Sequence, residues 1–561
     1  MKRLVLVAGA AWAIVVFLPG SPLQAQPAPP QRITLLQTSD LHAYIYPYDY
    51  YQGREADVGL ARVATLVEEV RAEGQPVLLL DAGDTIQGSP VGYYHHRKHD
   101  GPDSPDLPDP MMLTMNHLRF DAMAVGNHEF NFGLASIESA RHDASFPWLS
   151  ANVVRDDGTP FFTPYLVKDV NGVRVGILGL ITPNVPNWES PENYAGLTFL
   201  DTVETARRYV PVLREKEGAD VVVVVTHQGL ERDLLTGLSN ETEYENQAYR
   251  LTRDVPGIDV VLLGHTHQRI EPQEVNGVVV CEPGRWGDSL CRVDLYIERG
   301  VSGDLQVGRW EGALLETGGV EPNQEVLDLA RPYHERTMAY INSVVGEAEA
   351  AIGAERARFQ DTPMMDLLQQ VMLEASGAQL SMAALLPYRF DGIDAGPITV
   401  QELFSFYVYD NTLVVVEVSG REVKEALEHS ARYYESSRPD PETGELLIEP
   451  NPAVRAYNFD MLAGAHYRID PTRPVGERIR ELSYQGREMD PESTFKLVTT
   501  NYRAAGGGGY RMLKEADVLW RSSEEVRNLL IEHIRKQGTI LPFCDFNWRV
   551  APDVTPGPPP P

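Results

Sequence analysis

The chain has 561 residues, 43% of them hydrophobic and 23% charged, with a formal net charge of −31 at pH 7. This acidic balance argues against polymeric nucleic acid as a partner, because binding to DNA or RNA depends on clustered Lys and Arg. The length exceeds what one hydrophobic core ordinarily serves, so we expect at least two domains.

The first 25 residues predict a cleaved signal peptide. Lys2 and Arg3 form a basic start, residues 4–18 are apolar, and residues 23–25 fit a cleavage site. The apolar run is short for a membrane span, and an uncleaved anchor is the alternative. We therefore expect a periplasmic or secreted chain that has no membrane contact after cleavage.

Residues 31–322 alternate strand-like and helical patterns. The predicted strands are RITLLQTSD, PVLLLDAGD, DAMAVGNHE, VRVGILGLIT, ADVVVVVTHQG and GIDVVLLGHTH, and the predicted helices are GLARVATLVEEVRAEG and the stretch near 201–217. Continuous Val, Leu and Ile runs are typical of strands that are covered on both faces. The pattern predicts a layered α/β domain.

The second half is organised differently. We expect a helical linker at 323–355, an α+β domain at 356–550 and a disordered Pro-rich tail at 551–561. Within the α+β domain, TLVVVEVSG and STFKLVTTNY read as strands and VKEALEHSARYY reads as a helix. Of the three cysteines, Cys281 and Cys291 could pair and leave Cys544 over, and three free thiols are the alternative.

Polar side chains follow five of the apolar runs, at the point where each run ends. They are Asp40 and His42, Asp84, Asn127 and His128, His227, and His265 and His267. Ligands in open α/β sheets bind outside the carboxyl ends of the strands, so we expect these groups to converge. Asp, His and Asn are ligands for Zn, Mn, Fe or Co. Each piece alone has an ordinary structural explanation, but the joint pattern predicts two divalent metal ions that act at phosphorus.

The ordered set D-x-H, GDxxxG, GNHE, TH and GHTH resembles the calcineurin-like metallophosphoesterases, and within them the 5′-nucleotidase family. The likeness covers almost all of the mature chain. It implies a four-layer α/β sandwich followed by a separate α+β substrate-binding domain. It also implies the ligand sets, namely Asp40, His42 and His267 for one metal and Asn127, His227 and His265 for the other, with Asp84 bridging both. His128 would act on the leaving-group oxygen.

The segment GNHEFN departs from the family at its last position. The family commonly has Asp there, paired with the catalytic His, whereas this chain has Asn131. A neutral amide can orient His128 but cannot stabilise an imidazolium by charge. Glu129 either orients this loop or caps the following helix, and Gly126 is expected to let the backbone turn sharply beside the metals.

The C-terminal half contains candidate substrate contacts. By the resemblance, Tyr409 and Tyr502 stack on the base and Asn411 bonds the base or ribose, whereas composition alone favours tyrosines in the core. Gly508 stands where relatives often carry Asp, so that contact cannot be transferred. Arg389 is a candidate phosphate contact, and a solvated surface arginine is the alternative.

Several longer segments favour one subgroup. GNHEFN, YDNTLVVVEVSG, residues 456–471, NYRAAGGGGY and NWR together resemble the bifunctional 2′,3′-cyclic-nucleotide 2′-phosphodiesterase/3′-nucleotidases. This implies a monomeric hydrolase of small nucleotides that opens the cyclic phosphate and then removes the 3′-phosphate. The alternatives are a 5′-nucleotidase or UDP-sugar hydrolase, a thiosulfohydrolase that shares the metal domain, and a non-catalytic nucleotide-binding surface protein.

Overall fold

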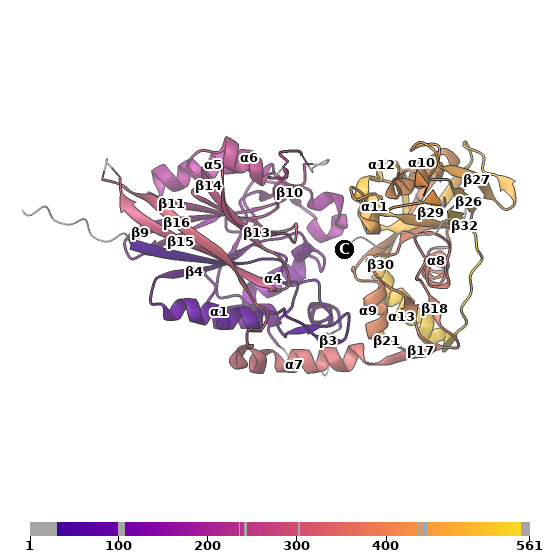
Figure 1. Cartoon of the computed structure of the whole chain (residues 1–561), viewed down its shortest axis with the longest axis horizontal. Coiled ribbons are helices and arrows are strands. Elements are labelled where there is room, and N and C mark those ends of the chain that lie inside the picture. Colours follow the sequence, from indigo (N-terminus) through magenta and orange to yellow (C-terminus); the bar gives the residue numbers. More distant parts are fainter. Residues whose placement is uncertain are drawn as a thin grey trace, which may run out of the picture.

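The computed structural model describes residues 31–98, 107–234, 236–239, 244–300, 303–435, 438–439 and 446–550. The predicted signal peptide and Pro-rich tail lie outside these residues. Figure 1 shows an N-terminal part and a C-terminal part, with helix α7 (Gln324–Ile341) running from one to the other. Within the described ranges, no helix is both long and apolar enough to cross a membrane.

Two six-stranded sheets build the N-terminal part. The first has the order β16 (Leu305–Glu316), β15 (Ser289–Arg299), β1 (Gln31–Thr38), β4 (Val77–Asp81), β5 (Ala122–Ala124) and β6 (Trp148–Leu149). The second has the order β13 (Arg269–Val275), β14 (Val278–Pro283), β12 (Val260–Leu262), β11 (Val221–His227), β9 (Val173–Ile181) and β8 (Tyr165–Val170). The central strands of each sheet run parallel, so their carboxyl ends share one edge.

The two sheets and their helices form four layers. One hydrophobic cluster lies between the sheets, and a second lies between the outer face of the second sheet and helices α5 (Thr202–Pro211) and α6 (Ala248–Asp254). Helices α1 (Leu60–Ala72), α3 (Pro110–Leu118) and α4 (Leu134–Asp143) cover the first sheet.

Strand β11 illustrates why this sequence forms buried parallel strands. Val221, Val223 and Val225 face the cluster between the sheets, whereas Val222 and Val224 face the outer helices. A strand that is covered on both faces needs apolar residues at every position, which is the pattern of the Val run. Burying each of these valine side chains contributes roughly 1.5–3 kcal/mol to the stability of the fold.

The C-terminal part is an α+β domain. Its main sheet has the order β25 (Asp460–Ala463), β19 (Leu380–Ala384), β29 (Thr494–Thr500), β22 (Thr412–Ser419) and β30 (Asp517–Glu525). A smaller sheet has the order β28 (Arg487–Glu488), β27 (Ile479–Tyr484), β26 (His466–Ile469) and β32 (Trp548–Val550). The accompanying helices include α8 (Pro363–Ser376), α9 (Val400–Phe406), α10 (Gly420–Ser430), α11 (Asn501–Ala504) and α13 (Val526–Gln537).

The predicted strands and helices named above are confirmed, with one difference at the linker. Helix α7 ends at Ile341, and the chain continues as strand β17 (Val344–Ala348) rather than as helix to residue 355. Strand β17 pairs with β21 (Gly396–Thr399) and β31 (Thr539–Ile540), so tertiary pairing decides its conformation.

The structure also decides between the two cysteine arrangements, because Cys281 and Cys291 form a disulfide and Cys544 is a free thiol.

Candidate active site

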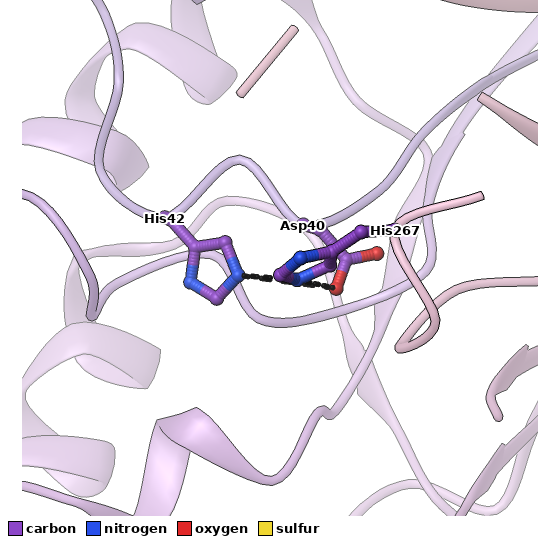
Figure 2. A group of neighbouring side chains, drawn as sticks. All are labelled: Asp40, His42 and His267. Carbon is purple, nitrogen blue, oxygen red and sulfur yellow. Dashed lines mark hydrogen bonds and ion pairs between the residues drawn. The ribbon is translucent and has the colours of Figure 1, made fainter. Parts of the chain in front are cut away.

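The polar groups at the strand ends converge in two clusters. Figure 2 shows the first, in which Asp40 and His42 follow β1 and His267 follows β12. The Nε2 atoms of His42 and His267 are 3.0 Å apart, and Nε2 of His267 lies 3.3 Å from Asp40 Oδ1. In the second cluster, Nε2 of His227 lies 2.9 Å from Asp84 Oδ2. One ligand atom each from Asp84, His227 and His265 lie within 4.8 Å of one another.

The donor atoms in both clusters fit divalent metal ions. Asn127 Oδ1 is buried and has no hydrogen-bond partner among the described residues, whereas the buried Asp40 Oδ1 and His227 Nε2 face other proposed ligands, His267 and Asp84. A buried polar atom without a partner is costly, so Asn127 Oδ1 is suited to a ligand, and the crowded donor atoms of the other residues could share a cation. Two histidines are oriented by the backbone, because Nδ1 of His42 lies 2.8 Å from Gln87 O and Nδ1 of His227 lies 2.8 Å from Ala82 O. Such contacts leave Nε2 available for a metal.

The backbone at these positions is also unusual. Asp40, His42, Asp84, His265 and His267 all have positive φ, between 49° and 76°. Residues other than glycine rarely adopt this left-handed region, and strained backbone collects at functional sites. Five of the seven predicted ligands therefore hold conformations that the surrounding structure must enforce.

Burial and neighbouring charges together shift the pKa values of the cluster residues. Burial would raise the pKa of Asp40, but His267 and His227 lower it to about 2. Burial lowers the pKa of His42 to about 3. Both residues are thus in the forms that bind metals, an ionised carboxylate and a neutral imidazole. Burial would lower the pKa of His227, but the charges of Asp84 and Asp40 raise it to about 10.

Glu129 joins the two loops that carry Asp84 and Asn127. Its fully buried carboxylate accepts hydrogen bonds from the backbone N–H groups of Gly126 at 2.6 Å, Asp84 at 2.9 Å and Thr85 at 2.6 Å. The same carboxylate makes no cap on α4, whose N-cap residue Gly133 has no side-chain cap. A Cβ atom at Gly126 would lie 2.2 Å from Asp84 Oδ1, so only glycine allows the two loops to approach this closely.

His128 lies at the edge of the second cluster. Its backbone N–H donates to Asp84 Oδ1 at 2.8 Å, and its Nε2 lies 3.9 Å from Asp84 Oδ2. Its Nδ1 lies 2.6 Å from Asn131 Oδ1, and the Asn131 amide donates in turn to Glu189 Oε2 at 2.5 Å. The amide that departs from the family pattern therefore connects His128 to a carboxylate.

A cavity of about 1430 Å³ lies between the two domains and contacts both clusters. The predicted substrate residues Arg389, Tyr409, Asn411 and Tyr502 line its C-terminal side. Tyr409 is 39% exposed, Arg389 is exposed and Tyr502 is half-buried, so none of the three belongs to the core. Asn411 Nδ2 lies 3.5 Å from the hydroxyl of Tyr407, which is buried.

The Gly-rich loop is shaped around its neighbours. A Cβ atom at Gly507 would lie 2.5 Å from the ring of Tyr502, so the loop packs directly against that ring. Gly508 has φ +72°, and a Cβ there would lie 2.4 Å from Asn458 Oδ1 and 2.7 Å from Arg503 Nη1. A side chain at position 508 is excluded because Asn458 and Arg503 occupy that space.

Sequence reasoning did not find several residues of this site. Glu189 contacts Asn131, Glu245 Oε1 lies 2.6 Å from His265 Nε2, and Arg285 Nη1 lies 3.3 Å from His267 Nδ1. In addition, the Gln87 side chain donates at 2.6 Å to Asp410 of the C-terminal domain. These residues have in common that they are polar and lie in loops near the carboxyl ends of strands. Too many other residues share that feature for it to identify them from the sequence.

Comparison with known proteins agrees with this architecture. The calcineurin-like phosphoesterase model matches residues 33–269, and the model of the 5′-nucleotidase C-terminal domain matches residues 344–515. The trifunctional nucleotide phosphoesterase protein YfkN of Bacillus subtilis is 32% identical over 96% of this chain, and the chain spans 40% of that protein's length. A 2′,3′-cyclic-nucleotide 2′-phosphodiesterase/3′-nucleotidase of Salmonella typhimurium is 31% identical over 93% of this chain and 89% of that protein.

A solved structure extends the comparison to three dimensions. The putative 5′-nucleotidase of Staphylococcus aureus matches with a TM-score of 0.81 and 26% identity, over 93% of this chain and all of that one. The fold and the resemblance predicted from the sequence are therefore confirmed. Membership implies a divalent metal, for which the two clusters supply the candidate ligands. The chain belongs to the 5′-nucleotidase family of calcineurin-like metallophosphoesterases.

Proposed function

We propose that this chain hydrolyses 2′,3′-cyclic nucleotides to 3′-nucleotides and then dephosphorylates the 3′-nucleotides to nucleosides. The observation that carries the proposal is the 31% identity to a relative of that name, 89% of which is covered by this chain. The cavity between the domains supports it, because metal-ligand side chains and aromatic side chains line the same space. Both steps break a P–O bond with water, so one site can serve both.

The proposed metal ligands follow the two clusters. Asp40, His42 and His267 would hold one divalent ion, Asn127, His227 and His265 the other, and Asp84 would contact both. Bound Mn, Co, Zn or Fe would polarise the phosphoryl oxygens and make water nucleophilic at neutral pH.

His128 is the proposed group at the leaving oxygen. Its Nδ1 is engaged by Asn131, and its side chain is 26% exposed and lines the cavity. Nε2 would therefore meet the ribose oxygen that leaves phosphorus, which is the 2′ oxygen in the first step and the 3′ oxygen in the second. General acid catalysis at such an oxygen typically contributes about 10²- to 10⁴-fold.

The C-terminal side of the cavity would bind the nucleoside. Tyr409 and Tyr502 offer ring faces for the base, and base–aromatic stacking is worth about 1–3 kcal/mol per base. Asn411 would bond the base or ribose, and Arg389 would attract the phosphate. Arg285 is a further candidate for the phosphate, because its guanidinium lies beside His267 in the first cluster. We also propose that the protein is a monomer and that it is exported, the export because its N-terminal residues read as a signal peptide.

The test is a direct comparison of substrates. The mature chain is stripped with a chelator, reloaded with Mn, Co or Zn, and assayed on 2′,3′-cyclic AMP, 3′-AMP and 5′-AMP. We expect activity to be lost on stripping and restored by metal, with the first two substrates hydrolysed and 5′-AMP slow. Preference for 5′-AMP would instead support a 5′-nucleotidase, the class to which the Staphylococcus aureus structure is assigned.

A further inference from the structure

Glu189 forms the far end of a hydrogen-bonded chain that starts at His128. The carboxylate is 6% exposed and lies in the loop that follows β9. Its Oε2 accepts from the Asn131 amide at 2.5 Å. Its Oε1 accepts from the backbone N–H of Ser190 at 2.6 Å and from the Asn193 amide at 2.9 Å. All three neighbouring groups donate a hydrogen bond to Glu189. This suits an ionised carboxylate, which can only accept hydrogen bonds.

This arrangement determines which way the Asn131 amide points. An amide can present either its oxygen or its NH₂ group to a neighbour. Because Glu189 can only accept, the NH₂ group of Asn131 must face it, and the oxygen must face His128. Nδ1 of His128 must then carry its hydrogen, which restricts proton exchange to Nε2, the atom on the other side of the ring.

We propose that Glu189 is a positioning residue that acts on His128 through Asn131. In this chain Asn131 orients the His128 ring, and Glu189 orients Asn131. The loop that carries Glu189 also contacts the C-terminal domain, because Asn501 Nδ2 lies 3.3 Å from Trp188 O. The inference rests on the proposed role of His128 at the leaving oxygen, but not on which nucleotide is preferred.

Glu189→Gln is the informative substitution, because it keeps shape and removes one acceptor. Ser190 and Asn193 both donate to Oε1, so they hold the oxygen of the new amide and turn its NH₂ group toward Asn131. Two NH₂ groups would then face each other, and Asn131 must flip and offer its NH₂ group to His128. We expect kcat on the 3′-nucleotide to fall about 10- to 100-fold, the usual cost of removing such a partner.

Two further measurements separate this role from a structural one. The double variant Asn131→Asp/Glu189→Gln places a hydrogen-bond acceptor beside His128, and the new amide at position 189 can donate to that carboxylate. Activity should therefore recover to within a few fold. A p-nitrophenyl phosphodiester, whose leaving group needs no proton, should lose less than about threefold in Glu189→Gln. Glu192→Gln is the matched control, since Glu192 is an exposed glutamate of the same loop and should behave as wild type.

The outcomes discriminate clearly. Selective loss on the nucleotide together with rescue by the second substitution supports the proposal. Unchanged activity, or equal loss on both substrates without rescue, overturns it. If the wild type prefers 5′-AMP, the proposed substrate is wrong, and the same comparison on 5′-AMP still decides the role of Glu189.

Discussion

The two sides of the cavity hold their side chains in different ways. On the N-terminal side, Asp40, Asp84 and His227 are at most 1% exposed, and the side chain of each contacts a backbone group. On the C-terminal side, Tyr409 is 39% exposed and Arg389 is a surface residue. Metal ions require ligands at fixed positions, whereas stacking on a base tolerates adjustment. In the proposed function, chemistry therefore belongs to the more buried side of the cavity and substrate selection to the more exposed side.

The largest loss should follow removal of Asp84, the residue proposed to contact both metal ions. We expect Asp84→Ala to lower kcat/KM by about 10⁴-fold, since several kcal/mol of metal-derived stabilisation disappear and each 1.36 kcal/mol is tenfold. Metal content, measured by inductively coupled plasma mass spectrometry, should fall with activity. Asp156→Ala, at an exposed aspartate of the same domain, serves as the control. Retained metal and retained turnover would show that Asp84 is not a shared ligand.

A smaller loss, without loss of metal, is expected at His128. His128→Ala should reduce kcat by about 10²- to 10³-fold, because it removes the group proposed to act at the leaving oxygen but leaves the cluster residues in place. Metal content should remain at the wild-type value. Turnover equal to wild type would remove His128 from the mechanism, and parallel loss of metal would assign it to the cluster instead.

The smallest effect should appear on the C-terminal side of the cavity. Tyr502→Ala should raise KM for nucleotides roughly tenfold, in line with the loss of one stacking contact, and leave hydrolysis of a small chromogenic phosphodiester almost unchanged. Tyr388→Ala is the matched control, because Tyr388 is exposed in the same cavity and is not expected to stack. Equal losses on both substrates would contradict the stacking role and point to a structural one.

The two sides also differ in how well they could be predicted. The metal loops follow Val- and Leu-rich strands, and parallel strands bring their carboxyl ends to one edge, so the convergence of Asp40, Asp84 and His227 follows from local pattern. The sequence predicts a helical linker at 323–355, but α7 ends at Ile341 and β17 follows, because β17 has strand partners that are far away in sequence.

Asn131 shows the limit of reading residues one at a time. On its own, the amide suggested that no charge supports His128. The structure brings Glu189 to within 2.5 Å of that amide from 58 positions away in the chain. A lone glutamate in a loop has no spacing or periodicity that would identify such a partner.

The sequence by itself determined the layered α/β fold, the family and the residue types that gather at the strand ends, because apolar periodicity and metal-ligand chemistry are local properties. The tertiary structure alone decided how Glu129 joins two loops, how Glu189 reaches Asn131 and which tyrosines face the cavity. Those contacts join segments that are distant in sequence, and only packing of the whole chain sets the distances between them.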